Sequence, residues 1–176
     1  MGAMDTAPEP ATPDTRDWTF VLDGGCPECG YAPHDPATTG ARLRAGVPRW
    51  QAVLRRPDVA ERPAPTVWST LEYACHSRDL IAVLGQRGRA MITEDTPVFA
   101  DYDGEAEAIR RRFWAADPAE VARQIAARTD ETVEIVEGVE DWERDGLRSD
   151  GRRFTIAQLC RYLLHDVEHH LHDVAG

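Results

Sequence analysis

The sequence contains no lysine, because all 20 of its basic residues are arginine. Chemistry through a Schiff base on a lysine amine is therefore excluded. The chain also lacks an excess of positive charge, since its formal net charge is -11. Binding to a nucleic-acid backbone relies on clustered cationic side chains, so this charge balance argues against nucleic acid as a partner.

Long apolar runs are missing as well. The sequence has no stretch of about 18 apolar residues, and its start lacks the basic-then-apolar pattern of a secretion signal. These absences predict no membrane span and a cytoplasmic location. The four cysteines, at positions 26, 29, 75 and 160, are spaced unlike a secreted disulfide framework, which favours a reducing compartment.

The length and composition fit one globular domain, since 176 residues with 42% hydrophobic content can bury a core without disulfides. Residues 1–16 are rich in proline, threonine, alanine and aspartate without periodicity, and they predict a disordered tail. The single domain then covers residues 17–176. At its start, Trp18–Leu22 is a short apolar run that predicts an extended segment lying on the domain.

Four long amphipathic segments predict helices, with little sign of strands and no internal repeat. Two begin with clear caps: Ser69 with Glu72 forms a capping box, and Asp117 precedes Pro118. The sequence therefore predicts an all-α fold, a four-helix bundle. The expected helices run from about 36 to 55, 69 to 92, 117 to 136 and 155 to 174, with a shorter helical turn at 105–114.

A Cys-x-x-Cys motif, Cys26-Pro-Glu-Cys29-Gly, precedes the first helix and resembles metal-binding knuckles. A tetrahedral zinc ion needs four ligands, and no second motif of this kind exists in the chain. Asp23, His34 or Asp35 would have to complete such a site. The motif is also compatible with a tight turn or with a redox pair, and these three interpretations stay open.

The last predicted helix concentrates the chemistry of the chain, since four of the six histidines lie between residues 165 and 173. Extending its apolar stripe places Asp166 and His170, spaced i and i+4, on or beside the buried face. The other histidines, at 165, 169 and 172, then tend toward the flank or the solvent. The competing register uses His165 and His169, and a solvated helix end is the remaining alternative.

A carboxylate and an imidazole on one helical turn suit a divalent metal, but such a site needs a third protein ligand. His76, on the 69–92 helix, lies on or beside that helix's buried stripe and is the expected third ligand. An aspartate and two histidines in an apolar core would be costly without a metal or hydrogen bonds. The residues therefore predict a metal site formed by His76, Asp166 and His170.

The motifs Trp68-Ser-x-Leu-Glu-Tyr-x-x-His76-x-x-Asp79 and Arg161-Tyr-Leu-Leu-His-Asp166-x-x-His-His170-x-x-Asp173 resemble the DinB/YfiT-like superfamily. The small actinobacterial members, with a CPECG loop before the bundle, are especially similar. The resemblance implies a four-helix bundle with one divalent metal, zinc or nickel, and covers most of the chain. It places His76, Asp166 and His170 at the ligand positions, with Asp166 where a histidine is commoner.

Relatives implied by this resemblance include mycothiol-dependent maleylpyruvate isomerase and bacillithiol transferases, in which the metal activates a low-molecular-weight thiol. The leading hypothesis is therefore a metal-dependent transferase or isomerase that uses a thiol of the mycothiol type and acts on a small electrophile. Glu72 is a candidate base or an orienting partner of His76, besides its capping role. Arg78 and Arg161 are weaker candidates for holding an anionic substrate.

Two other functions fit the same residues. One is a non-catalytic metal-binding or redox-sensing module, either monomeric or homodimeric. In this module the Cys26–Cys29 loop would respond to metal or to redox state. The other is metal-dependent hydrolysis, which needs a water instead of a thiol.

Overall fold

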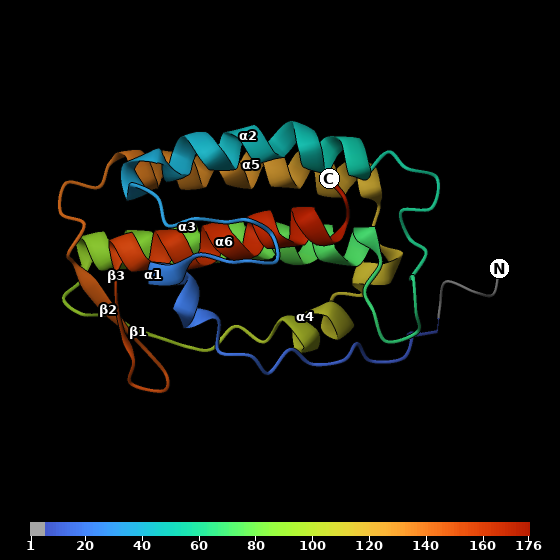
Figure 1. Ribbon diagram of the computed structural model, residues 1–176, viewed down its shortest axis with the longest axis horizontal. Helices are drawn as coiled ribbons and strands as arrows, with labels where there is room; N and C mark the ends of the chain where they lie inside the picture. The colour runs from blue at the N-terminus through green and yellow to red at the C-terminus, as the bar shows by residue number, and fades with distance from the viewer. Residues whose placement is uncertain (1–5) are drawn as a thin grey trace.

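The computed structural model describes residues 6–176 and is mostly helical (Figure 1). Four long helices form its body: α2 (Thr39–Val53), α3 (Thr70–Thr93), α5 (Pro118–Glu137) and α6 (Ile156–Asp173). The shorter elements are η1 (Trp18–Phe20), α1 (Val21–Gly24), η2 (Pro36–Thr38), α4 (Gly104–Arg110) and η3 (Phe113–Ala115).

The four long helices pack as a bundle in which each contacts two neighbours. Helix α3 lies between α5 and α6, and α2 contacts the same two helices from the other side. In Figure 1, α2 and α5 form one layer, and α3 and α6 form the second layer below it. The predicted four-helix bundle is confirmed in its helical architecture.

The helix starts agree with the capping signals of the sequence. The Ser69 side chain accepts a hydrogen bond from the Glu72 backbone, and the Glu72 side chain accepts one from the Ser69 backbone, which completes the capping box of α3. Asp117 caps α5, and Thr155 with Gln158 forms a second capping box at α6. Satisfying these N-terminal donors sets where each helix begins, and hence which side chains face inward.

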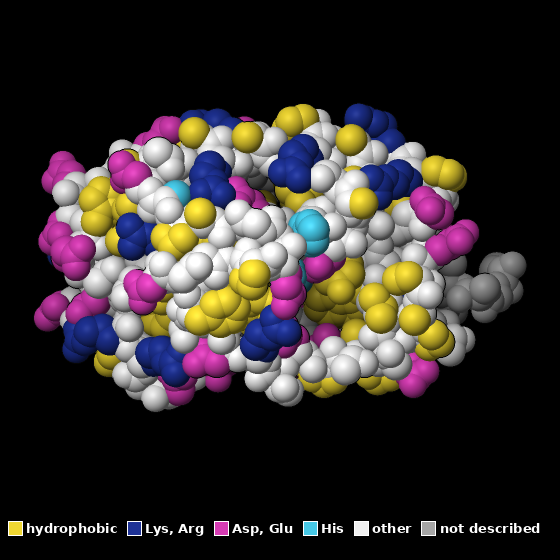
Figure 2. Space-filling view, in the orientation of Figure 1, with side chains coloured by type: hydrophobic (Ala, Val, Ile, Leu, Met, Phe, Trp, Pro, Cys, Tyr) yellow, Lys and Arg dark blue, Asp and Glu magenta, His cyan; other side chains and the backbone are white. Residues whose placement is uncertain are grey.

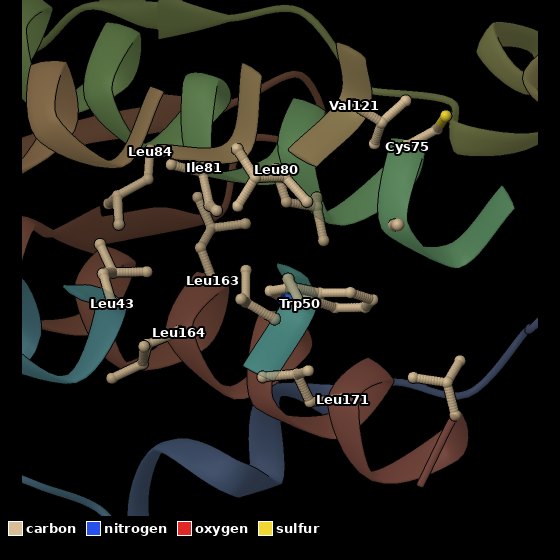
Figure 3. Close-up of a cluster of buried hydrophobic side chains, with 14 of the residues drawn as sticks. Leu43, Trp50, Cys75, Leu80, Ile81, Leu84, Val121, Leu163, Leu164 and Leu171 are labelled. Atoms are coloured by element: carbon tan, nitrogen blue, oxygen red, sulfur yellow. The ribbon is translucent and has the colours of Figure 1, made fainter. Parts of the chain in front are cut away.

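The core between the layers is built from aliphatic side chains around one large aromatic residue. Trp50 of α2 is 1% exposed and lies among leucines of α3 and α6 (Figure 3). The labelled members of this cluster are Leu43, Trp50, Cys75, Leu80, Ile81, Leu84, Val121, Leu163, Leu164 and Leu171. Their burial holds α3 and α6 side by side, and the inward residues of these two helices form the site described below.

A small three-stranded sheet corrects the expectation of little strand structure. β1 (Val98–Phe99) pairs in parallel with β2 (Asp145–Arg148), which pairs antiparallel with β3 (Arg153–Thr155). The strands have two to four residues, too few for an alternating pattern to be visible in the sequence. Gly146 is required here, because a Cβ at this position would lie 2.4 Å from the Phe99 ring.

The chain before the bundle also differs from expectation. Trp18–Leu22 is not extended but forms η1 and the first half of α1, and the Asp17 side chain caps η1 by accepting from the Thr19 backbone. Of the predicted tail, residues 1–5 lie outside the described residues. The remainder runs along the bundle in Figure 1, where Ala11 is buried and the Thr12 amide donates to the Thr66 carbonyl.

The surface is mixed in character. Figure 2 shows acidic and basic side chains interspersed with hydrophobic ones, and a histidine side chain near the middle of the displayed face. In the described part of the chain, no helix has the length and apolar character needed to cross a membrane.

Candidate functional site

Two histidines from distant parts of the sequence meet on the inward side of α3 and α6. The rings of His76 and His170 have centroids 5.1 Å apart and lie nearly perpendicular, at 67°. Capping fixes the register of α3 and α6, so these residues, far apart in the chain, are brought together by helix packing. The pair supplies two of the three ligands in the metal site that the sequence predicts.

The surroundings of His76 leave it neutral and partly unbonded. Its ring packs against Trp68 and Tyr102, with centroids 5.1 and 5.7 Å away. Burial, together with the nearby His170, holds the pKa of His76 well below its usual range. Its Nδ1 atom is enclosed and has no hydrogen-bond partner among the described residues. Histidine binds a metal as the neutral imidazole, through the lone pair of its unprotonated nitrogen.

His170 is oriented from behind by a carboxylate. Its Nδ1 lies 3.0 Å from Oδ2 of Asp173, one turn further along α6, and its ring packs on Tyr73 with centroids 5.0 Å apart. A hydrogen bond at Nδ1 fixes the tautomer, so that Nε2 becomes the nitrogen with a free lone pair. Metal-binding histidines are commonly held in this way.

Two cavities meet at this site. An inner cavity of about 330 Å³ lies between α3, α6 and the small sheet, and an outer one of about 700 Å³ opens beside the N-terminal segment. The residues that line both are His76, Asp101, Tyr102, Tyr162 and Asp166. Two of the three predicted metal ligands therefore lie where the cavities join, and the third, His170, lines the outer cavity.

Asp166, the third predicted ligand, lies near both the cavities and His165. It lines both cavities, yet its Oδ1 atom lies 3.5 Å from Nδ1 of the preceding residue, His165. Within the described chain, the donor atoms of His76, Asp166 and His170 are not all within 4.8 Å of one another. Binding a metal at these three residues would therefore require their side chains to move closer together.

Two arginines that the sequence analysis did not assign line the inner cavity, together with the carboxylates of Asp101, Asp150 and Asp166. Arg87 and Arg148 line it beside Phe99, and the Arg87 guanidinium lies 5.4 Å from the Phe99 ring centroid. Burial, with the neighbouring Arg148, lowers the pKa of Arg87. A signal for Arg87 was present, because it lies one turn after Val83 and one turn before Met91, on the same face of α3. Arg148 carried none, since its strand was not expected.

The arginines predicted to hold an anion lie elsewhere. Arg78 is 6% exposed, and its guanidinium donates to Asp79 and Gln124. Arg161 donates to the backbone carbonyl of His34. Neither lines the inner or the outer cavity.

Glu72 is completely buried beneath the start of α3, where it accepts hydrogen bonds from the Ser69 backbone and hydroxyl and forms an ion pair with Arg62. It lines neither cavity and has no hydrogen bond to His76 among those of the described chain. Its contacts are those of a structural carboxylate. By contrast, Glu105 lines the outer cavity, where burial and Asp103 raise its pKa.

A second group of potential ligands lies on the neighbouring face of α6. The donor atoms of Cys26, Cys29, His165 and His169 all lie within 4.8 Å of one another. His165 is 1% exposed and His169 is 9% exposed. The expectation that both point to the flank or the solvent is therefore wrong, because the Cys26–Cys29 loop and Trp18 cover that side of the helix.

The residues expected to join the two cysteines are engaged elsewhere. His34 uses both ring nitrogens, with Nδ1 3.0 Å from the Tyr31 hydroxyl and Nε2 2.9 Å from the Thr39 hydroxyl. Asp35 caps η2, and Asp23 lies on the exposed side of α1. The two partners supplied by α6 could not be found from the local sequence, because they lie at the other end of the chain.

The thiols of the loop have unequal environments. Burial raises the pKa of Cys29 to about 11. Burial acts in the same direction on Cys26, but the Cys29 and Glu28 amides and His165 outweigh it, so the pKa of Cys26 lies below its usual value. In the described chain, Cys26, Cys29, Cys75 and Cys160 are all free thiols.

A family model described as the DinB superfamily matches residues 57–174, which include α3, α5 and α6. The chain belongs to the DinB superfamily. A similar solved structure is described as YfiT from Bacillus subtilis, "a probable metal-dependent hydrolase with an unusual four-helix bundle topology". The match has a TM-score of 0.65 and 17% identity, and it covers 80% of this chain and 79% of YfiT. A search of curated proteins found no match.

This likeness supports the DinB fold of the chain, and the helical bundle agrees with the fold described for YfiT. Both the His76–His170 pair and the His165–His169 pair lie within the part matched by the DinB family model, whereas Cys26 and Cys29 precede it. The cysteine loop is thus an addition to the matched region.

Proposed function

We propose that this DinB protein is a metal-dependent enzyme that acts on a small molecule, with His76, Asp166 and His170 as protein ligands of one divalent metal. The observation that carries the proposal is the approach of His76, at the junction of two cavities, to His170 of the outer cavity, with 5.1 Å between ring centroids. The similarity to YfiT, a probable metal-dependent hydrolase, supports the same chemistry.

The donor set fits a divalent metal. The unbonded Nδ1 of His76 and the Asp173-oriented ring of His170 provide neutral imidazoles, and Asp166 provides one negative charge. Three protein ligands leave a coordination position open, as catalytic sites require. A divalent metal such as zinc or nickel would supply Lewis acidity there, which generates a nucleophile from a thiol or a water near neutral pH.

The chain's own residues would bind and orient the substrate. The apolar wall of the inner cavity, formed by Leu80, Val83, Met91 and Phe99, excludes water from an apolar substrate body. Arg87 at the same cavity provides donors for a carboxylate or another anionic group, whereas Arg148 is paired with Asp150 of the same lining. We therefore infer a small substrate that has an apolar part and one anionic group.

The outer cavity is the larger space, and it suits the second reactant. A low-molecular-weight thiol of the mycothiol class would occupy it in a transferase or isomerase, whereas hydrolysis would need only water there. Tyr73, Tyr102 and Glu105 line this cavity and are the groups available to hold or move a proton beside the histidines. The hydrolase is therefore the second candidate, favoured by the similarity to YfiT.

The test uses full-length protein purified without a polyhistidine tag and loaded with zinc or nickel. We expect His76→Ala to lose the pocket metal and activity toward thiol-reactive electrophiles, and His172→Ala, an exposed histidine on α6, to keep both. Turnover that depends on added thiol would identify the transferase, and turnover without thiol the hydrolase. Unchanged metal content in both His76→Ala and Asp166→Asn would refute the assigned ligands.

A further inference from the structure

The loop after α1 and one face of α6 bring together two cysteines and two histidines that no part of the proposed reaction uses. We propose that Cys26, Cys29, His165 and His169 form a closed tetrahedral zinc site that links the N-terminal segment to α6. This site is separate from the metal pocket, defined as the proposed site of His76, Asp166 and His170. The proposal does not rest on the proposed enzymatic function, because neither cysteine nor either of these histidines is assigned there.

The spacing of the donors matches the ion. Zinc bonds to sulfur and nitrogen are about 2.3 Å and about 2.0 Å long, so a tetrahedral angle places the two atoms about 3.5 Å apart. The Cys26 sulfur lies 3.6 Å from Nδ1 of His169. All four donor atoms lie within 4.8 Å of one another. A small inward shift of the side chains is therefore enough to complete the coordination.

The buried polar atoms of His165 need a partner. The residue is 1% exposed, and neither of its ring nitrogens has a hydrogen bond within the described chain, although Nδ1 lies 3.5 Å from Oδ1 of Asp166. Enclosing such atoms without partners is costly, and coordination of one nitrogen would remove much of that cost. Trp18 packs on both histidine rings, with centroids 5.2 and 4.9 Å away, and Tyr31 packs on His165 at 5.2 Å. These aromatic rings cover one side of the two histidines, whose other sides line the outer cavity.

The loop has the backbone of a preformed knuckle. The Gly30 amide donates to the Cys26 carbonyl at 2.9 Å, and the Cys26 amide donates to the Tyr31 carbonyl at 2.8 Å. Gly25 and Gly30 both have positive φ, at 71° and 75°. A Cβ on Gly25 would lie 2.5 Å from the Tyr31 carbonyl oxygen, so glycine is required there. The turn thus presents both sulfurs on the side facing α6.

Carboxylates complete the surroundings of His169. With Nδ1 directed at the Cys26 sulfur, Nε2 lies 3.5 Å from Asp173 and 3.8 Å from Glu28. Such outer carboxylates orient metal-binding histidines and raise their basicity. Two thiolates and two imidazoles on a tetrahedron favour zinc over harder ions, and four protein ligands leave no open position for a substrate.

A fastening of this kind is needed because the N-terminal segment has little core of its own. Its buried cluster contains Val21, Cys26 and Tyr31, with few partly buried neighbours. Two hydrogen bonds tie the following residues to α6: the Tyr31 hydroxyl donates to the Arg161 carbonyl, and Arg161 donates to the His34 carbonyl. The zinc would link the loop to α6 beside the pocket ligands of the same helix.

The experiment is X-ray absorption at the zinc edge on full-length, untagged wild-type protein kept reduced. We expect about two sulfur neighbours at about 2.3 Å per zinc in protein that holds one zinc per chain. A coordination shell of only nitrogen and oxygen, or protein that binds zinc solely through His76, would overturn the proposal. A Cys26–Cys29 disulfide in reduced protein, detected by mass spectrometry, would overturn it too.

Cobalt substitution provides the variants with a readout that does not depend on activity. We expect a thiolate-to-cobalt charge-transfer band in the wild type that is lost in Cys26→Ser and Cys29→Ser. The band should persist in Cys75→Ala, which removes a buried thiol elsewhere, and in His76→Ala, which removes a pocket ligand. If the cysteine variants do not fold, the wild-type absorption spectrum still decides the matter. Loss of the band in His76→Ala would contradict the separation of the two sites.

Discussion

The Nδ1 atom of His170 lies 3.0 Å from Oδ2 of Asp173, while the other oxygen of the same carboxylate lies 3.5 Å from Nε2 of His169. One aspartate thus contacts one histidine of each proposed metal site. Asp173 lies on the last turn of α6, where it was visible in the sequence but had no assigned partner.

Replacing Asp173 should weaken both sites without removing a ligand. We expect Asp173→Asn to lower the metal affinity of the pocket about 10-fold to 100-fold, because His170 loses the carboxylate that orients and polarises it. Competition with a chromophoric chelator measures this affinity. Asp130→Asn, an exposed change on α5, is the control. Unaltered affinity in Asp173→Asn would mean that the carboxylate does not support a bound metal.

The Gly104 position tests the placement of His76. A Cβ at residue 104 would lie 2.6 Å from Cε1 and 2.8 Å from Nδ1 of the His76 ring, so Gly104→Ala must displace that ring. We expect lower metal affinity and activity in a protein that still folds, as followed by circular dichroism. Gly88→Ala is the matched control, because its Cβ would meet Ile135 at 3.6 Å, an ordinary contact. Equal metal affinity in the two variants would argue against His76 as a ligand.

Glu72 should affect stability and leave the pocket chemistry intact. Its side chain is 1% exposed and pairs with Arg62, so Glu72→Gln leaves a largely buried cation without its partner. We expect a loss of about 3 kcal/mol in the free energy of unfolding, measured by denaturant titration. Glu120→Gln breaks an exposed pair with Arg123 and should cost less than about 1 kcal/mol. Full metal loading of the folded Glu72→Gln protein would separate its role from catalysis.

His34 should make stability depend on pH in a defined range. Burial and the nearby Arg42 lower its pKa to about 4, whereas the unfolded chain has a value of about 6.5. The unfolded state therefore binds more protons between these values, so His34 stabilises the fold above about pH 6.5 and this contribution is lost as the pH falls toward about 4. We expect His34→Gln to flatten the pH profile of unfolding in this range. An unchanged slope would refute the role of His34.

The long helices were predictable because their signals are local. Each capping residue, from Ser69 to Thr155, is adjacent in sequence to the helix that it starts, and the apolar periodicity identifies the buried face. The same periodicity predicted that His76 and the end of α6 face a common interior. The strands at residues 98, 145 and 153 were missed, since their pairing depends on contacts that are distant in sequence.

The orientation of α6 was only half predictable. Its apolar stripe predicted Asp166 and His170 beside the core, and both are half-buried and line the outer cavity. It could not indicate that His165 and His169 are also buried, because their cover comes from Trp18 and the cysteine loop at the other end of the chain. A helix with two covered faces departs from the pattern of a single apolar stripe facing the core.

The neighbouring positions of the two proposed ligand pairs on α6, 165 with 169 and 166 with 170, have a consequence for the evolution of this protein. An amino-acid substitution that shifts or rotates α6 moves all four side chains together. A shift of the helix therefore cannot change the geometry of one site without changing that of the other. Selection on one site must therefore act on individual side chains of α6, or on the residues that face them. These are His76 for one site and the cysteine loop for the other. The position of α6 is thus constrained by the geometry of both proposed sites.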